Sequence, residues 1–428
     1  MNPASFLRKL LGGGGGGVER RIRDLLALCE QLLAERGEYT STALARDALA
    51  AYQGLDERSR EEFFDMVARH YSPSPEAVSR VAADYQADPS PQNLARLQEM
   101  AEPPRQELFR RLNMAAGGTA ALVEMRIELL KGMKAHPQWR VIDYDLMHLL
   151  RSWFNRGFLR LERIDWRTSA IVLEKLIQYE AVHAIQGWRD LRRRLEADRR
   201  CFAFFHPQLP DEPIIFIEVA LTRGMSAHVQ PLLDLKSPVA TVANADCAMF
   251  YSITNCQEGL RGISFGNLLI KQVAEELKRE FPHLRRFATL SPVPGFRRWL
   301  EQTDEKEVLK KIEDPAWHLG EIPETLQAQL MRLCAHYLVQ AKHGEEPLDP
   351  VARFHLSNGA SLERLNWMGD TSEQGMKRSA GVMVNYVYWL AEVERNHERY
   401  FRERAVVAAP AVEKLARELA AAQKGKAA

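Results

Sequence analysis

The sequence predicts a multidomain α+β protein in which an all-α helical bundle precedes an α/β domain. Three observations lead to this prediction. The chain has 428 residues, which is long for one domain and comfortable for two. Its first part shows helical periodicity with helix start and stop signals. Its second part alternates β-rich runs with amphipathic stretches, which is the pattern of α/β domains.

Residues 18 to about 200 are expected to be helical. The stretch 18–37 places apolar residues on one stripe and ends at Gly37. Residues 56–73 begin at an acidic cap and stop before a proline, and 74–90 repeat this pattern with prolines at both ends. An antiparallel bundle is the natural packing for such helices. We expect residues 1–17, with their run of glycines, to form a flexible tether, and 18–165 to form a scaffold or oligomerisation domain.

Residues 166–428 are expected to form the α/β domain. Residues 201–222 contain two short β-rich runs around a proline turn, and 246–254 form a further strand candidate. A glycine loop, a helix over 267–281 and a strand within 285–296 follow. Strand, loop, helix and strand in succession indicate an α/β unit.

Composition limits the classes of partner. The formal net charge is +1, which gives no reason to expect nucleic acid or an anionic membrane as a partner. No apolar stretch approaches the roughly 20 residues that span a bilayer. The five cysteines are odd in number and show no metal-ligand spacing. Reduced thiols in a cytoplasmic compartment are therefore expected, with no metal site.

The glycine loop is the first candidate for chemistry. Backbone N–H groups at the start of a helix attract phosphate, and small residues allow a close approach. The loop fits neither G-x-x-x-x-G-K-[ST] nor G-x-G-x-x-G, so from its residues alone a plain turn is about as good an interpretation as a phosphate cradle. The candidate residues are Arg261, Gly262, Ile263, Ser264, Phe265, Gly266 and Asn267.

The loop resembles the Q/R-x-x-G-x-G/A signature with which GNAT-type acetyltransferases hold the pyrophosphate of coenzyme A, although Ser264 replaces the first glycine. Longer stretches make the resemblance more specific. Residues 247–300 and 351–390 are similar to the core of malonyl-CoA decarboxylases, and the likeness extends from about His136 to Leu390.

The resemblance implies a GNAT-like catalytic domain and the conversion of malonyl-CoA to acetyl-CoA and CO2, a lyase reaction of fatty-acid metabolism. It implies homo-oligomers, commonly tetramers. It places a catalytic serine at Ser291 in S-P-x-P-G-F and a catalytic histidine at His355 in R-[FY]-H-L-x-N-G-A. A supporting tyrosine corresponds to Tyr388, and the phosphate loop corresponds to 261–267. No cofactor is expected, because coenzyme A is part of the substrate.

The chemistry is compatible with these residues. A malonyl thioester can lose CO2 into its own carbonyl and form an enolate, so the site must orient the breaking bond, stabilise an oxyanion and deliver a proton. We expect His355 to protonate the enolate, because imidazole changes charge near neutral pH. We expect Ser291 to position the carboxylate, or else to act as proton acceptor. Without the resemblance, a structural histidine and an ordinary Ser-Pro turn would be the simpler interpretations of His355 and Ser291. Core packing of Tyr388 is nearly as good an interpretation as contact with the reacting group.

Two other functions stay open at this point. A GNAT-fold acyltransferase acting on an amine would transfer the acyl group without releasing CO2. A non-catalytic acyl-CoA-binding regulatory module would bind malonyl-CoA without consuming it.

Overall fold

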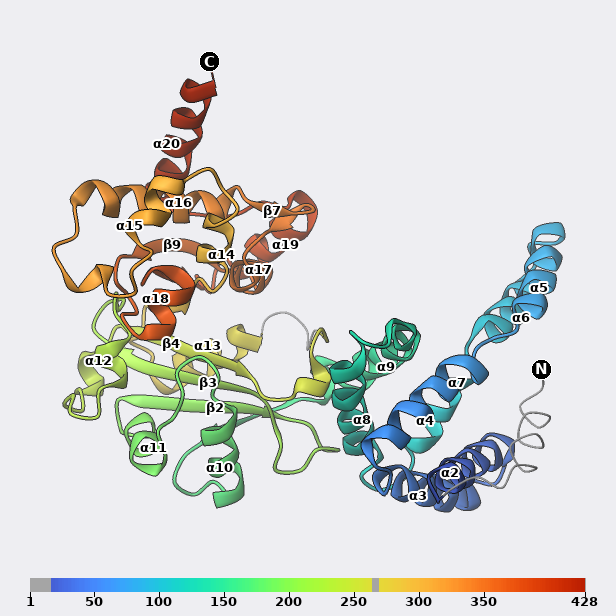
Figure 1. The fold of residues 1–428 in the computed structure, drawn as a ribbon. Helices are drawn as coiled ribbons and strands as arrows, with labels where there is room; N and C mark the ends of the chain where they lie inside the picture. The colour runs from blue at the N-terminus through green and yellow to red at the C-terminus, as the bar shows by residue number, and fades with distance from the viewer. Residues whose placement is uncertain (1–16, 264–268, 428) are drawn as a thin grey trace. The chain divides into compact units, whose positions relative to one another are not determined.

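The computed structural model describes residues 17–263 and 269–427, and the tether residues 1–16 lie outside this range. The chain forms two compact units. The helical unit contains residues 17–159 together with 206–210 and 257–263. The sheet unit contains residues 160–205, 211–256 and 269–427. The predicted combination of an all-α part and an α/β part is confirmed (Figure 1).

Polar caps and prolines set the helix starts in the helical unit. The Asp56 side chain accepts a hydrogen bond from the Ser59 N–H at the start of α4, and Ser74 and Ser90 cap α5 and α6 in the same way. The aromatic rings of Phe64 and Trp139 pack 5.1 Å apart in its core. The helices are α2 (Gly17–Ala34), α3 (Glu38–Gln53), α4 (Glu57–His70), α5 (Pro75–Ala87), α6 (Pro91–Ala101), α7 (Pro104–Leu112), α8 (Gly118–Gly132) and α9 (Arg140–Trp153).

The prediction that residues 18 to about 200 are helical is wrong beyond α9, most clearly at one strand. Residues Arg160–Ile164 form strand β1, which pairs antiparallel with β2. The segment carries few apolar residues because it is an edge strand whose outward side chains are solvated, so its sequence resembles a polar helix face. The compact units divide after residue 159, whereas the domain boundary at 165 stays a prediction.

One mixed sheet organises the sheet unit. Its strands follow the order β1-β2-β3-β4-β5-β10-β6, and β9 pairs with β10. Among the strand pairs of the described residues, only β4 and β5 are parallel, and helix α13 lies between them in the chain. The strands of this sheet are β1 (Arg160–Ile164), β2 (Arg199–Phe205), β3 (Pro213–Thr222), β4 (Cys247–Asn255), β5 (Arg286–Thr289), β6 (Ser291–Pro292), β9 (Ser361–Asn366) and β10 (Met383–Val387). Strands β7 (Lys342–His343) and β8 (Glu346–Pro347) form a separate hairpin.

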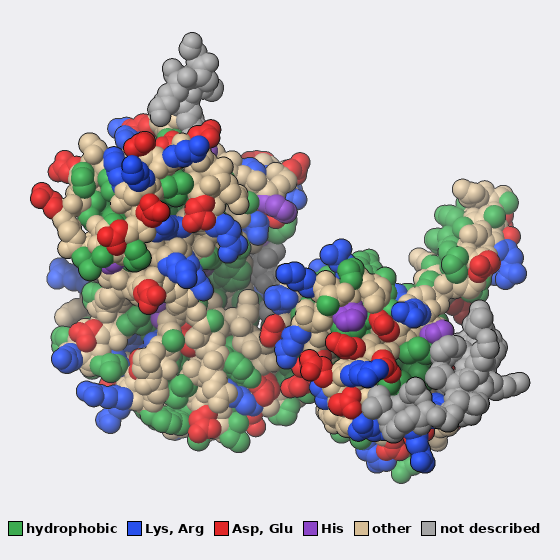
Figure 2. Space-filling view, viewed as in Figure 1, with side chains coloured by type: hydrophobic (Ala, Val, Ile, Leu, Met, Phe, Trp, Pro, Cys, Tyr) green, Lys and Arg blue, Asp and Glu red, His purple; other side chains and the backbone are tan. Residues whose placement is uncertain are grey.

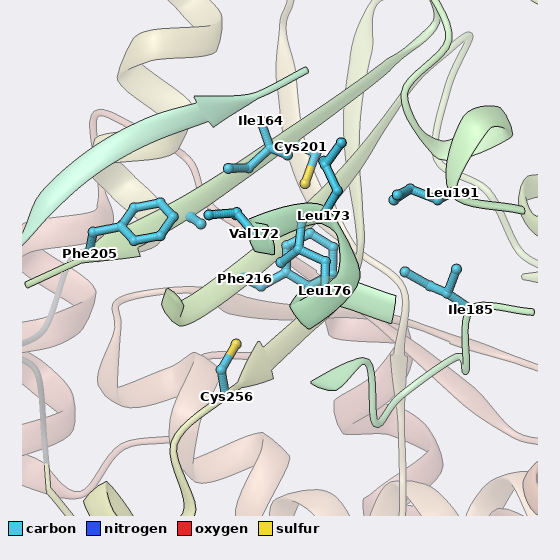
Figure 3. Packing of buried hydrophobic residues seen from close by; sticks show 11 residues of the cluster. Ile164, Val172, Leu173, Leu176, Ile185, Leu191, Cys201, Phe205, Phe216 and Cys256 are labelled. Atoms are coloured by element: carbon cyan, nitrogen blue, oxygen red, sulfur yellow. The ribbon is translucent and has the colours of Figure 1, made fainter. Parts of the chain in front are cut away.

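Helices cover the sheet on both faces. Figure 3 shows Val172, Leu173 and Leu176 of α10 packed against Cys201 of β2 and Phe216 of β3. The helices are α10 (Ala170–Tyr179), α11 (Trp188–Arg194), α12 (Gln230–Leu233), α13 (Leu269–Glu280), α14 (Phe296–Leu300), α15 (Lys306–Lys311), α16 (Glu324–Val339), α17 (Pro350–Ser357), α18 (Glu373–Ser379), α19 (Val393–Glu403) and α20 (Pro410–Ala427).

The alternation along β5 and β6 decides which residues share a face. Ala288 and Leu290 pack in one apolar cluster with Val229 and Leu232, beside α12. Successive side chains of an extended strand point to opposite faces. Thr289 and Ser291 therefore point to the other face of the sheet, away from that cluster.

The visible surface carries the mixed charges, and the cysteines the free thiols, that the sequence predicts. Figure 2 shows acidic and basic side chains interspersed on the visible face of each unit. All five cysteines are free and buried. Among the described residues, no helix combines the length and apolar character that crossing a bilayer requires.

Candidate active site

Ser291 lies where strand β5 passes into β6. It faces Val384 of β10 in the antiparallel ladder, and its side chain is buried. Its hydroxyl donates a hydrogen bond to the Thr289 Oγ1 atom at 2.9 Å. The following Pro292 restricts the backbone, and Gly295 to Phe296 open helix α14. The serine is therefore held by sheet pairing on one side and by a restrained turn on the other.

His355 comes from helix α17 and meets this serine. The Nε2 atom of His355 lies 2.9 Å from the Ser291 Oγ atom, and its Nδ1 atom lies 2.8 Å from the Tyr388 hydroxyl. The imidazole also stacks on the Tyr386 ring, with 4.6 Å between centroids. Three residues that the sequence singled out thus form one continuous chain of hydrogen bonds: Ser291, His355 and Tyr388.

Helix α17 is itself firmly positioned. The buried Asp349 carboxylate accepts hydrogen bonds from the N–H groups of Val351 and Ala352 at 2.9 Å and 2.8 Å. Pro350 occupies the first turn of α17, where its missing N–H costs nothing. This cap fixes the start of the short helix that carries His355.

Burial dominates the electrostatics of the site. His355 is 3% exposed, and burial lowers its pKa from 6.5 to about 3. Burial also raises the pKa of Tyr388 well above its usual value. The imidazole is therefore neutral at physiological pH in the ligand-free protein. The expectation that it changes charge near neutral pH is wrong for this site, because burial lowers the pKa and no carboxylate of the described residues offsets the loss of solvation.

The glycine loop is described only at its beginning. Arg261 is exposed, Gly262 has a left-handed φ of 81°, and Ile263 is buried. A left-handed backbone favours glycine at position 262. Ser264, Phe265, Gly266 and Asn267 lie outside the described residues. The phosphate cradle therefore stays a prediction.

Arg126 of α8 anchors the start of the loop, and sequence reasoning missed it. This buried guanidinium donates from Nη1 to the carbonyl oxygens of Gly259 and Arg261 at 2.7 Å and 2.9 Å. Its Nε donates to Asp143 at 2.8 Å. The signal in the sequence was an arginine within an apolar helix, which rarely occurs unless the charge is paired.

A large cavity in the sheet unit lies elsewhere. It has a volume of about 1470 Å³, and residues of α12, α14 and α18 line it. Neither Ser291, His355 nor Tyr388 is among its lining residues. Within the described ranges, no group of three or more His, Cys, Asp or Glu side chains is arranged to hold a metal ion.

Comparisons with known proteins agree along the chain. The profile described as the malonyl-CoA decarboxylase C-terminal domain matches residues 157–427, and that of the N-terminal domain matches 71–154. "Malonyl-CoA decarboxylase, mitochondrial" from Anser anser anser is 39% identical over 341 residues, covering 71% of this chain and 68% of that protein. The protein of the same name from Rattus norvegicus is 37% identical, covering 70% and 68%.

Solved structures give the same result. The crystal structure of malonyl-CoA decarboxylase from Rhodopseudomonas palustris superposes with a TM-score of 0.88 at 49% identity, covering 92% of this chain and 99% of that chain. The one from Agrobacterium vitis superposes with a TM-score of 0.86 at 45% identity, with the same coverage.

Proposed function

The chain belongs to the malonyl-CoA decarboxylase family, and on that premise we propose that Ser291, His355 and Tyr388 form the centre at which malonyl-CoA loses CO2. The family's activity is that of a carboxy-lyase, with malonyl-CoA as substrate and acetyl-CoA and CO2 as products. The observation that carries the assignment of the site is the chain of contacts from Ser291 Oγ through both nitrogens of His355 to the Tyr388 hydroxyl.

In the first step the C–C bond to the carboxylate breaks. Its electron pair moves into the thioester carbonyl, which produces CO2 and the enolate of acetyl-CoA. In the ligand-free protein the Ser291 hydroxyl donates to Thr289 Oγ1; when substrate binds, this proton turns to the departing carboxylate and holds that group out of the thioester plane, the orientation that the reaction needs. A hydroxyl with a high pKa suits this task, since the malonyl carboxylate is already ionised at neutral pH.

In the second step the enolate carbon is protonated. A neutral imidazole can act as the acid if one nitrogen releases a proton while the other receives one. Nε2 of His355 gives its proton toward the carbon, and Nδ1 takes the proton of the Tyr388 hydroxyl. The Tyr388 oxygen then takes its proton back from Nδ1 while Nε2 receives one from water, which restores the starting tautomer. The step balances without an imidazolium ion, which agrees with the low pKa of His355.

The glycine loop, residues 261–267, would hold the coenzyme A diphosphate. Helix α13 begins directly after this loop, and helix N-termini favour anions. A Gly266→Val substitution should raise KM by excluding the diphosphate sterically. Unchanged affinity for coenzyme A would contradict the cradle.

We propose that the reaction needs no added cofactor, because the thioester serves as its own electron sink. We also propose that the protein self-associates, with a tetramer as the expected form. Its proposed location is cytoplasmic. Five buried free thiols support a reducing compartment.

The direct test is incubation of the full chain with malonyl-CoA and a chelator, with no other addition. Acetyl-CoA and CO2 should appear in equal amounts as malonyl-CoA disappears. Binding of malonyl-CoA without consumption, or consumption without CO2, would contradict the assignment.

A further inference from the structure

The Ser291 hydroxyl makes two contacts but carries one proton. Its Oγ atom donates to the Thr289 Oγ1 atom at 2.9 Å and lies 2.9 Å from the Nε2 atom of His355. Once the proton of a hydroxyl is committed, its oxygen can act only as an acceptor in a further hydrogen bond. The hydrogen in the second contact must therefore come from Nε2 of His355.

Thr289 is well placed to hold that proton. Its side chain is fully buried and lies two residues before Ser291 on the same face of the sheet. Its Oγ1 atom also accepts the N–H of Tyr386 at 3.2 Å, which ties the hydroxyl to strand β10. A β-branched side chain has little rotamer freedom. The acceptor position is thus fixed by the sheet.

The other ring nitrogen completes the assignment. With hydrogen on Nε2, a neutral imidazole has a bare Nδ1, which accepts from the Tyr388 hydroxyl at 2.8 Å. We propose that Thr289 is a positioning residue that sets the tautomer of His355: by taking the Ser291 proton, it keeps the imidazole hydrogen on Nε2, facing Ser291. The catalytic consequence of this inference rests on the proposed function, but the tautomer itself does not.

Loss of the Thr289 hydroxyl has a definite effect on this chain. The Ser291 proton then turns to Nε2 of His355, which becomes the acceptor. The ring hydrogen moves to Nδ1 and is donated to the Tyr388 oxygen. The acid of the protonation step would then face away from the reacting carbon, while the diphosphate grip would be unaffected and the fold would lose only the bond from the Tyr386 N–H.

Nitrogen NMR of ¹⁵N-histidine-labelled, ligand-free protein measures the tautomer directly, with His355 assigned by its absence in His355→Gln. We expect wild type and Thr289→Ser to bear the hydrogen on Nε2, and Thr289→Val to bear it on Nδ1. Hydrogen on Nδ1 in wild type would overturn the inference even if the valine variant failed to fold. The same tautomer in wild type and Thr289→Val would also overturn it.

Kinetics give the second readout. Thr289→Val should lower kcat at least about tenfold, the scale of one hydrogen bond that orients an acid, with KM within about twofold. Thr289→Ser should restore kcat. Ser361→Ala is the matched control, because this buried hydroxyl of β9 donates to the Val387 carbonyl oxygen and, among the described residues, to no side chain of the site. Equal loss in the control would overturn the role of Thr289.

The proposed function and the role of Thr289 can be contradicted independently. If Thr289→Val changes the tautomer relative to wild type but wild type releases no CO2, the proposed function fails. The role of Thr289 in setting the tautomer then stands. If wild type decarboxylates and Thr289→Val keeps both tautomer and kcat, only the inference on Thr289 fails.

Discussion

The Nε2 atom of His355 lies 2.9 Å from the Ser291 Oγ atom, although the two residues are 64 positions apart in the chain. Strand pairing and a capped helix create this proximity. Ser291 is held against Val384 of β10, and Asp349 caps the helix that carries the imidazole. The pair is therefore a property of the folded sheet unit and not of a local loop.

Tyr388→Phe should lower kcat by about tenfold, because it removes a single hydrogen bond and the proton source at Nδ1 of His355. KM should stay close to the wild-type value, since Tyr388 touches His355 and no contact with the substrate is needed. Steady-state kinetics with malonyl-CoA measures both. Tyr251→Phe is the matched control: it removes another buried hydroxyl, from β4, and should leave kcat unchanged. Wild-type kcat in Tyr388→Phe would remove the tyrosine from the relay.

The pH profile of kcat/KM should show no step from titration of His355. Burial lowers the pKa of His355 to about 3, so the imidazole is neutral in the free enzyme throughout the range from about pH 5 to 8. The kcat/KM profile should therefore show no loss of activity from this group as pH falls through 6.5, the usual histidine value. A limb with a midpoint near that value, absent in a His355 variant, would show that the imidazole titrates during catalysis. Circular dichroism at each pH checks that the protein stays folded.

Arg126→Lys should raise KM for malonyl-CoA. One guanidinium holds Asp143 and the carbonyl oxygens of Gly259 and Arg261, whereas an ammonium group cannot reproduce this forked geometry. The start of the glycine loop should loosen and raise KM about fivefold, with kcat within about twofold.

Arg105→Lys controls for the general cost of replacing a buried arginine in the helical unit. Arg105 pairs with Asp145 and donates to Tyr71 and Ser72, all outside the glycine loop. It should lower stability without changing KM. A KM that rises equally in both variants would contradict the specific role of Arg126.

Asp349→Asn should change how stability depends on pH. Burial raises the pKa of Asp349 from 3.8 to about 6. Between these values the folded state binds more protons than the unfolded state, so this carboxyl's contribution to the free energy of unfolding falls as pH rises from about 4 to 6. An amide does not titrate, and its oxygen can still accept the N–H groups of Val351 and Ala352.

The measurement is urea unfolding of wild type and Asp349→Asn at pH 4.5 and 7. Relative to wild type, the variant should gain stability on going from the lower to the higher pH, by at most about 3 kcal/mol. A difference between the two proteins that does not change with pH would show that Asp349 has an ordinary pKa.

The site was predictable where motifs are local and contiguous. Ser291 and His355 stand in distinctive short motifs, and the structure brings them into contact. The partners Thr289 and Arg126 were not predictable in the same way, because their roles depend on register and on contacts distant in sequence. Strand β1 was missed because an edge strand buries little and its composition resembles that of a polar helix. The charge state of His355 also escaped prediction, since burial rather than residue type sets its pKa.

The most direct test of the central claim is the turnover of Ser291→Ala and His355→Gln on malonyl-CoA, measured as CO2 released by the full chain, with Ser361→Ala as control. Each site variant should lose about 10²- to 10⁴-fold in kcat while KM changes by about twofold or less. The control should retain wild-type turnover. Near-wild-type kcat in either site variant would contradict the assignment of Ser291 and His355 as the decarboxylation centre.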